Sequence, residues 1–105
     1  MPIAIYNKQI KPTAGVLTSI LLVPELITLE EIVACNESAV ADAIRIMIKV
    51  DPLDPDMYIV YDLPLTANNT YTAEFRDYLV AGSEIKVYSA NGTTSFSLYS
   101  FANNP

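Results

Sequence analysis

The sequence has no histidine, one cysteine and three glycines, and each shortage excludes a class of site. A single cysteine cannot form a disulfide within the chain, so we expect no covalent cross-link to stabilise the fold. Without histidine, Cys35 has no neighbouring base that could convert its thiol into a nucleophilic thiolate. The glycines at 15, 82 and 92 stand too far apart to form a phosphate-binding loop. The sequence therefore predicts no enzyme and no cofactor.

Acidic residues form two groups, and neither has a catalytic or metal-binding spacing. Glu30 and Glu31 are adjacent, so in a strand they would point to opposite faces and could not act together across a cleft. The segment DPLDPDMYIVYD, from Asp51 to Asp62, is stiffened by two prolines and has no glycine for the sharp turn of a calcium loop. We favour a solvated acidic loop there, with a weak calcium site as the alternative.

Long hydrophobic runs are also missing. The longest, such as ILLV at 20–23, are far too short to cross a bilayer. The start, MPIAIYNKQIKP, lacks the charged and apolar regions of a secretory signal. We therefore expect a soluble protein that is made in a reducing cytoplasm and has no membrane partner.

Positive charge is scarce. Six basic residues face twelve acidic ones, which gives a formal net charge of −6, and the basic residues are scattered along the chain. A net negative charge without a basic stripe opposes the binding of a polyanion. Nucleic acid is therefore not an expected partner.

Apolar residues are abundant. They make up 51% of the chain, whereas only 17% of the residues are charged. A small domain with this composition exposes more apolar surface than a monomer usually tolerates. The surplus indicates that a partner covers part of it, in a homo-oligomer or a larger assembly.

A period of two is the main structural signal. In residues 43–50, apolar residues alternate with Arg45, Met47 and Lys49, which predicts a strand with one dry and one wet face. Residues 26–35 alternate as well, although Glu31 and Ile32 break the pattern, and this alternation places Cys35 inward as a buried structural residue. A helix is the competing interpretation, because EEIVA forms helices well, but the β-branched residues favour a strand. The expected inward residues of the two strands are Ile27, Leu29, Val33, Cys35, Ile44, Ile46, Ile48 and Val50.

Further strands recur about every ten residues, with turn residues between them. They are predicted at 15–23, 57–61, 70–75, 84–89 and 95–101, and the ANG step at 90–92 indicates a hairpin. The sequence thus predicts an all-β fold. We expect one antiparallel β-sandwich, immunoglobulin-like or jelly-roll-like, of about seven to eight strands.

The first twelve residues precede the strand series and end at Pro12. We divide the chain into an N-terminal arm or edge strand, 1–12, and a sandwich domain, 13–105. As an edge strand, 1–12 would pair within the sandwich domain of the same chain. As an arm, it would add a strand to a neighbouring subunit. Its apolar residues are the candidate interface: Ile3, Ile5, Tyr6 and Ile10.

Four stretches together carry a family resemblance: IVACNES, IRIMIKV, YIVYDLPLTANNT and YLVAGSEIKVYSANGTTSFSL. Their order resembles that of small virion proteins of tailed bacteriophages. The matching positions are Asn36, the segment from Tyr58 to Pro64, and Leu79, Gly82, Glu84, Ile85 and Val87. The resemblance covers about residues 16–101 and implies a sandwich that decorates a head or belongs to a neck or tail. It also implies rotationally symmetric oligomers, with a trimer favoured.

We therefore expect a virion structural protein that decorates or cements the capsid exterior, with other virion proteins as its partners. A first alternative is a neck, baseplate or tail-fibre attachment protein. A second, of another class, is a non-viral sandwich that binds carbohydrate or peptides through some of the seven tyrosines.

Overall fold

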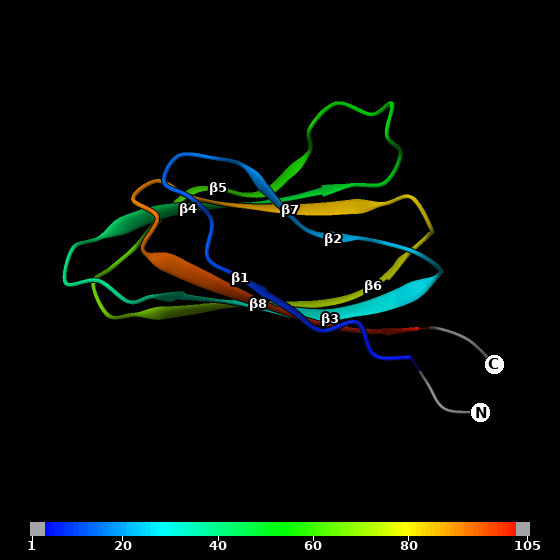
Figure 1. Ribbon diagram of the computed structural model, residues 1–105, viewed down its shortest axis with the longest axis horizontal. Helices are drawn as coiled ribbons and strands as arrows, with labels where there is room; N and C mark the ends of the chain where they lie inside the picture. The colour runs from blue at the N-terminus through cyan, green and yellow to red at the C-terminus, as the bar shows by residue number, and fades with distance from the viewer. Residues whose placement is uncertain (1–3, 103–105) are drawn as a thin grey trace.

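The computed structural model describes residues 4–102, and all of its regular elements are strands. Eight strands form two four-stranded antiparallel sheets that face each other (Figure 1), so the predicted β-sandwich is confirmed. The strands are β1 (Lys8–Ile10), β2 (Thr18–Leu22), β3 (Ile27–Asn36), β4 (Asp42–Lys49), β5 (Tyr58–Leu65), β6 (Thr70–Leu79), β7 (Glu84–Ser89) and β8 (Thr94–Ala102). Within the described residues, no helix is long and apolar enough to span a membrane.

The strand order is that of a jelly roll. One sheet has the order β1-β8-β3-β6 and the other has the order β2-β7-β4-β5. The first four strands thus pair with the last four in reverse: β1 with β8, β2 with β7, β3 with β6, and β4 with β5. Only β4 and β5 are neighbours both in sequence and in a sheet. This arrangement decides between the two predicted topologies in favour of the jelly roll.

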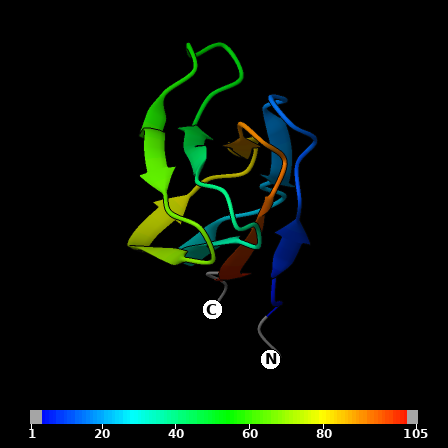
Figure 2. The same ribbon diagram turned by 90° about the vertical axis from the view of Figure 1, so that its left-hand side faces the viewer.

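Four connections meet at one end of the sandwich, which we call the loop end (Figure 2). They are residues 11–17, 37–41, 66–69 and 90–93, and backbone hydrogen bonds join them. The Glu37 amide donates to the Thr93 carbonyl and the Asn68 amide donates to the Ser38 carbonyl, both at 3.0 Å, and the Gly15 amide donates at 2.9 Å to the carbonyl of Ser89, the last residue of β7. The predicted hairpin at 90–92 is wrong, because β7 and β8 are not paired. That turn instead carries the chain from β7 in one sheet to β8 in the other.

The inward orientation predicted for Cys35 is also wrong. Against β8, Leu29 pairs with Ser100 and Glu31 with Tyr99, so β3 contains one extra residue at Glu30. Such a bulge reverses the faces of all the residues that follow. Ile32 and Ala34 are therefore buried, whereas Val33 and Cys35 are only half-buried on the outer face.

In β4, Ile44, Ile46 and Ile48 are buried as predicted. Val50 is exposed because the strand ends at Lys49. Met47 was expected on the wet face, yet it is fully buried. The cause is its position between Tyr58 and Lys86, which lie directly opposite on the two flanking strands and cover it.

Strand β5 runs through Pro64 to Leu65, beyond its predicted end at 61. A proline is tolerated there because β5 is the outermost strand of its sheet, where a missing N–H removes no essential bond. Strand β6 likewise continues past 75 to Leu79.

Residues 4–10 lie along β8 of their own chain and make β1 the edge strand of one sheet. The Tyr6 amide donates to the Ser100 carbonyl at 3.0 Å, and the Tyr6 hydroxyl donates to Glu25 Oε2 at 2.5 Å. Tyr6 and Ile10 pack against the core, and Ile5 is exposed. Ile3 lies outside the described residues, and an interface role for this set stays a prediction.

We expect Gly92→Ala to destabilise the fold more than Gly15→Ala. Both glycines have positive φ, which costs an alanine about 1–2 kcal/mol. A Cβ on Gly92 would also lie 2.9 Å from the Ala14 nitrogen, whereas one on Gly15 would meet nothing within 4 Å. The extra crowding should add about 1–3 kcal/mol, measured by urea unfolding. Equal losses in the two variants would contradict close packing at the loop end.

Candidate functional site

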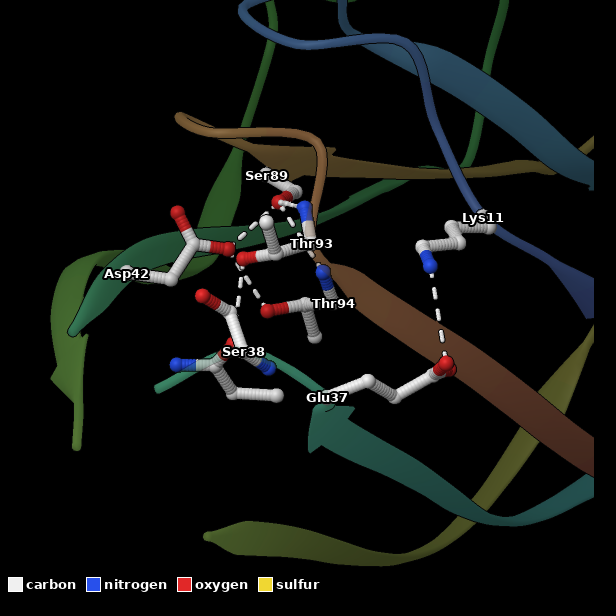
Figure 3. A network of polar contacts seen from close by, with 8 residues as sticks. Lys11, Glu37, Ser38, Asp42, Ser89, Thr93 and Thr94 are labelled. Atoms are coloured by element: carbon white, nitrogen blue, oxygen red, sulfur yellow. Dashed lines mark hydrogen bonds and ion pairs between the residues drawn. The ribbon is translucent and has the colours of Figure 1, made fainter. Parts of the chain in front are cut away.

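A buried polar network at the loop end is the first candidate (Figure 3). The Asp42 carboxylate accepts hydrogen bonds from the hydroxyls of Ser89 and Thr94, the latter at 2.6 Å. It also accepts from the backbone amides of Asn91 and Ala43, both at 2.9 Å. The carboxylate thereby joins β4 and β7 of one sheet to β8 of the other.

Asn36 forms the second half of this network. Its Nδ2 donates to the carbonyls of Val40 at 2.9 Å and Leu65 at 3.2 Å. Its Oδ1 accepts from the Ser38 amide at 3.1 Å and the Thr93 hydroxyl at 3.0 Å. Among the described residues, no buried polar side-chain atom lacks a partner. The network therefore joins the loops to one another and offers no free group to a ligand.

Hydrogen bonding determines the charge state of Asp42. Burial alone would raise the pKa of this carboxyl group, but the bonds from Ser89, Thr94, Asn91 and Ala43 outweigh that effect. The pKa is therefore lower than the ordinary value, and the ionised form is the stable one.

The carboxylates of the segment from Asp51 to Asp62 bind different partners and do not converge. Asp51 Oδ1 accepts from the Leu53 amide at 2.9 Å, Asp56 pairs with Lys49 at 3.5 Å, and Asp62 turns to Arg45. In residues 4–102, no three carboxylate, thiol or imidazole groups converge in a way that could hold a metal ion. The segment therefore supplies no ligand set for the calcium site that was the alternative to a solvated acidic loop.

The outer face of the β4–β5–β7 sheet carries a cluster of aromatic rings around one cation, which we call the tyrosine–arginine cluster. The Arg45 guanidinium lies 4.3 Å from the Tyr61 ring centre and 4.4 Å from that of Tyr88. Tyr58 packs edge-on against Tyr61 with centres 4.9 Å apart. Asp62 completes the cluster, because its two oxygens accept from Arg45 Nε at 2.6 Å and Nη2 at 3.2 Å.

A bulge in β5 builds this cluster. Leu63 pairs with Ile44 and Val60 with Ile46, so three steps along β5 match two along β4. Asp62 lies within the bulge at a φ of 51°, in the left-handed region that aspartate tolerates better than most residues. The Asp62 hydrogen bond raises the pKa of Arg45 above its already high ordinary value, so the guanidinium stays charged.

The lateral side formed by β5 and β6 is more apolar than the rest of the surface. On the opposite side, β1 contacts β2 and closes the sandwich. We call the β5–β6 side, with residues 50–61 and 76–80, the open side. Of thirteen large apolar side chains that are exposed among the described residues, eight belong to it. They are Val50, Leu53, Met57, Tyr58, Ile59, Tyr61, Tyr78 and Val80, of which Tyr58 and Tyr61 belong to the tyrosine–arginine cluster on the adjoining outer face.

A groove of about 630 Å³ runs along this side between the two sheets. Its apolar lining includes Val50, Met57, Ile59 and Tyr78, and its polar lining includes Asp54 and Arg76. The side chains of Ile59 and Tyr78 remain 54% and 70% exposed, so the groove is not filled by its own chain. This concentration of exposed apolar side chains makes the open side the candidate interaction surface.

The sequence predicts an interface at Ile3, Ile5, Tyr6 and Ile10, and the described members of this set lie on the opposite side of the sandwich from the groove. It did not single out the open side. A signal was present in MYIVY, where consecutive apolar residues replace the alternation expected of a strand with one wet face.

No protein-family model matches the chain, and no curated protein sequence matches it. The fold is similar to part of a chain in the solved structure of infectious bursal disease virus, Gx strain, with a TM-score of 0.53 and 11% sequence identity. The match covers 97% of this chain but only 30% of that one. At this identity the likeness shows the fold alone.

We expect Asp42→Asn to lower stability by about 2 kcal/mol at pH 7, because hydrogen bonds to a buried charge are lost. The folded pKa is lowered, so the ionised carboxylate stabilises the wild type above pH ~4, the unfolded value. That contribution disappears as pH falls through the folded pKa. The difference between wild type and variant should therefore shrink on acidification in urea unfolding, whereas exposed Glu30→Gln should match the wild type at pH 7. A difference that grows in acid would contradict the network.

Proposed function

We propose that this chain is a virion structural protein that decorates or cements the capsid exterior of a tailed bacteriophage. The observation that carries the proposal is the open side, where eight large apolar side chains are exposed and four of them, Val50, Met57, Ile59 and Tyr78, line an unfilled groove. Burial of such a surface against neighbouring subunits would stabilise a shell without any chemistry.

Two further observations support this function. Jelly rolls are a recurrent fold of viral capsid domains, although lectins and cupins also use them. Part of a chain in a solved virus structure has a similar fold, and the match covers 97% of the present protein. The phage assignment itself comes from the resemblance of IVACNES and the stretches after it to small phage virion proteins.

The proposed partners are other virion proteins and further copies of this chain, with a trimer favoured. Because contacts repeat with the symmetry of a shell, even weak ones add up through avidity. The net charge of −6 argues for a place away from the packaged DNA. A neck, baseplate or fibre-attachment site in the same virion would use the same kind of contact.

The test is removal of this chain from the phage that encodes it. Particles lacking a cement protein should still assemble but should release their DNA at a lower temperature than wild-type particles, measured by dye access during heating. Quantitative mass spectrometry of wild-type particles should find a copy number that matches the number of capsid subunits. A copy number equal to one ring would favour the neck or tail, and absence from purified particles would overturn the virion role.

The tyrosine–arginine cluster favours one other function, the binding of a neutral carbohydrate. Its rings are partly exposed, and Asp62 neutralises Arg45, which suits an uncharged polyol better than an anion. In a glycan screen, this function predicts hits that Tyr61→Ala abolishes and Tyr78→Ala, a change at an exposed tyrosine outside the cluster, leaves intact. If Tyr61→Ala left the hits unchanged, carbohydrate binding by the cluster would be contradicted.

A further inference from the structure

We propose that a second copy of this chain covers the open side, with Leu53 of one copy inserted into the groove of its neighbour. The inference rests on the proposed function only in treating the open side as an assembly surface. It adds the identity of the partner and the residue that makes the central contact.

The projecting half of this contact is the β4–β5 connection, residues 50–57. It rises away from the sandwich in both views (Figures 1 and 2). Leu53 in this connection is 93% exposed, the highest value among the large apolar side chains that are exposed in the described residues. The Leu53 amide donates to Asp51 Oδ1, and the Asp54 amide donates to the Asp51 carbonyl, both at 2.9 Å. These bonds give the projection a defined turn.

The receiving half is the groove beside it. Ile59 of β5, with Val50 and Met57 at the two ends of the β4–β5 connection, provides one apolar wall, and Tyr78 and Leu79 of β6 provide the other. Its volume of about 630 Å³ exceeds that of one leucine side chain, so the flanking residues of the projection could enter with it. One chain thus carries both a projection and a matching hollow on the same side.

The charges at the groove suit a second copy. Asp54 and Arg76 line it with Asp77. In the part of the chain from 4 to 102, none of the three forms an ion pair. A neighbouring copy brings the same set, so Arg76 of each copy could meet Asp54 or Asp77 of the other.

Packing through side chains is favoured over strand addition at this side. The edge of β5 carries Pro64, a bulge and the left-handed Asp62. The edge of β6 has a register shift, since Leu29 pairs with Asp77 but Glu31 pairs with Glu74. Bulges and prolines of this kind prevent a further strand from pairing along an edge.

The first test is the mass of the purified chain by light scattering after size exclusion, at about 100 μM. We expect two or three times the monomer mass of 11.5 kDa. Leu53→Asp and Ile59→Asp should each return the protein to the monomer mass. Leu22→Asp is the matched control, because Leu22 is 64% exposed on β2, at the other lateral side. Circular dichroism melting verifies that each variant is folded.

A cross-linking experiment covers the case in which an aspartate variant unfolds. In a Cys35→Ser background, a chain with Leu53→Cys is mixed with one carrying Ile59→Cys and is then oxidised. We expect a mixed disulfide dimer, and no such dimer when Leu22→Cys replaces Leu53→Cys.

A monomeric wild type at this concentration, or a cross-link as efficient from position 22 as from position 53, would overturn the proposal. A monomer found in quantity on phage particles would overturn this inference while leaving the virion function intact. An oligomer in solution that is absent from purified particles would overturn the virion function and leave this inference intact.

Discussion

The pairing of the first four strands with the last four in reverse order is the constraint on which the structure depends. It places consecutive strands in opposite sheets, with only β4 and β5 as sequential neighbours in one sheet. Four connections must therefore cross between the sheets at the loop end, where their backbone polar groups need partners. The hydrogen bonds of Asn36 and Asp42 supply several of them. The same topology leaves β5 and β6 as the outer strands of the open side.

The sequence predicted the all-β class and most strands, because alternation between wet and dry faces is a local property. It could not predict the pairing order, since all but one of the reverse pairs join strands that are distant in the chain. The bulge at Glu30 shows why periodicity alone cannot predict which face a side chain occupies. Glu31 and Ile32 broke the alternation, but only the unequal register against β8 shows that the face reverses there. Cys35 consequently moved from the predicted core to the outer face.

The candidate surface was harder to predict than the fold. Composition indicated surplus apolar surface, and the structure shows where much of it lies, on the open side. Its location depends on which strands end each sheet, and sequence periodicity carries no information on that. The N-terminal residues looked like an arm because they are apolar and bounded by Pro12. In the structure Tyr6 and Ile10 contact the core of their own chain, so that segment has less apolar surface to offer than β5.

The central claim is that a second copy of this chain covers the open side. Hydrogen–deuterium exchange measured over a range of protein concentrations tests it most directly. The account predicts that amides in residues 50–61 and 76–80 become slower to exchange as concentration rises, while those in β1 and β2 keep their rates. Protection confined to β1 and β2, or no dependence on concentration anywhere, would contradict it.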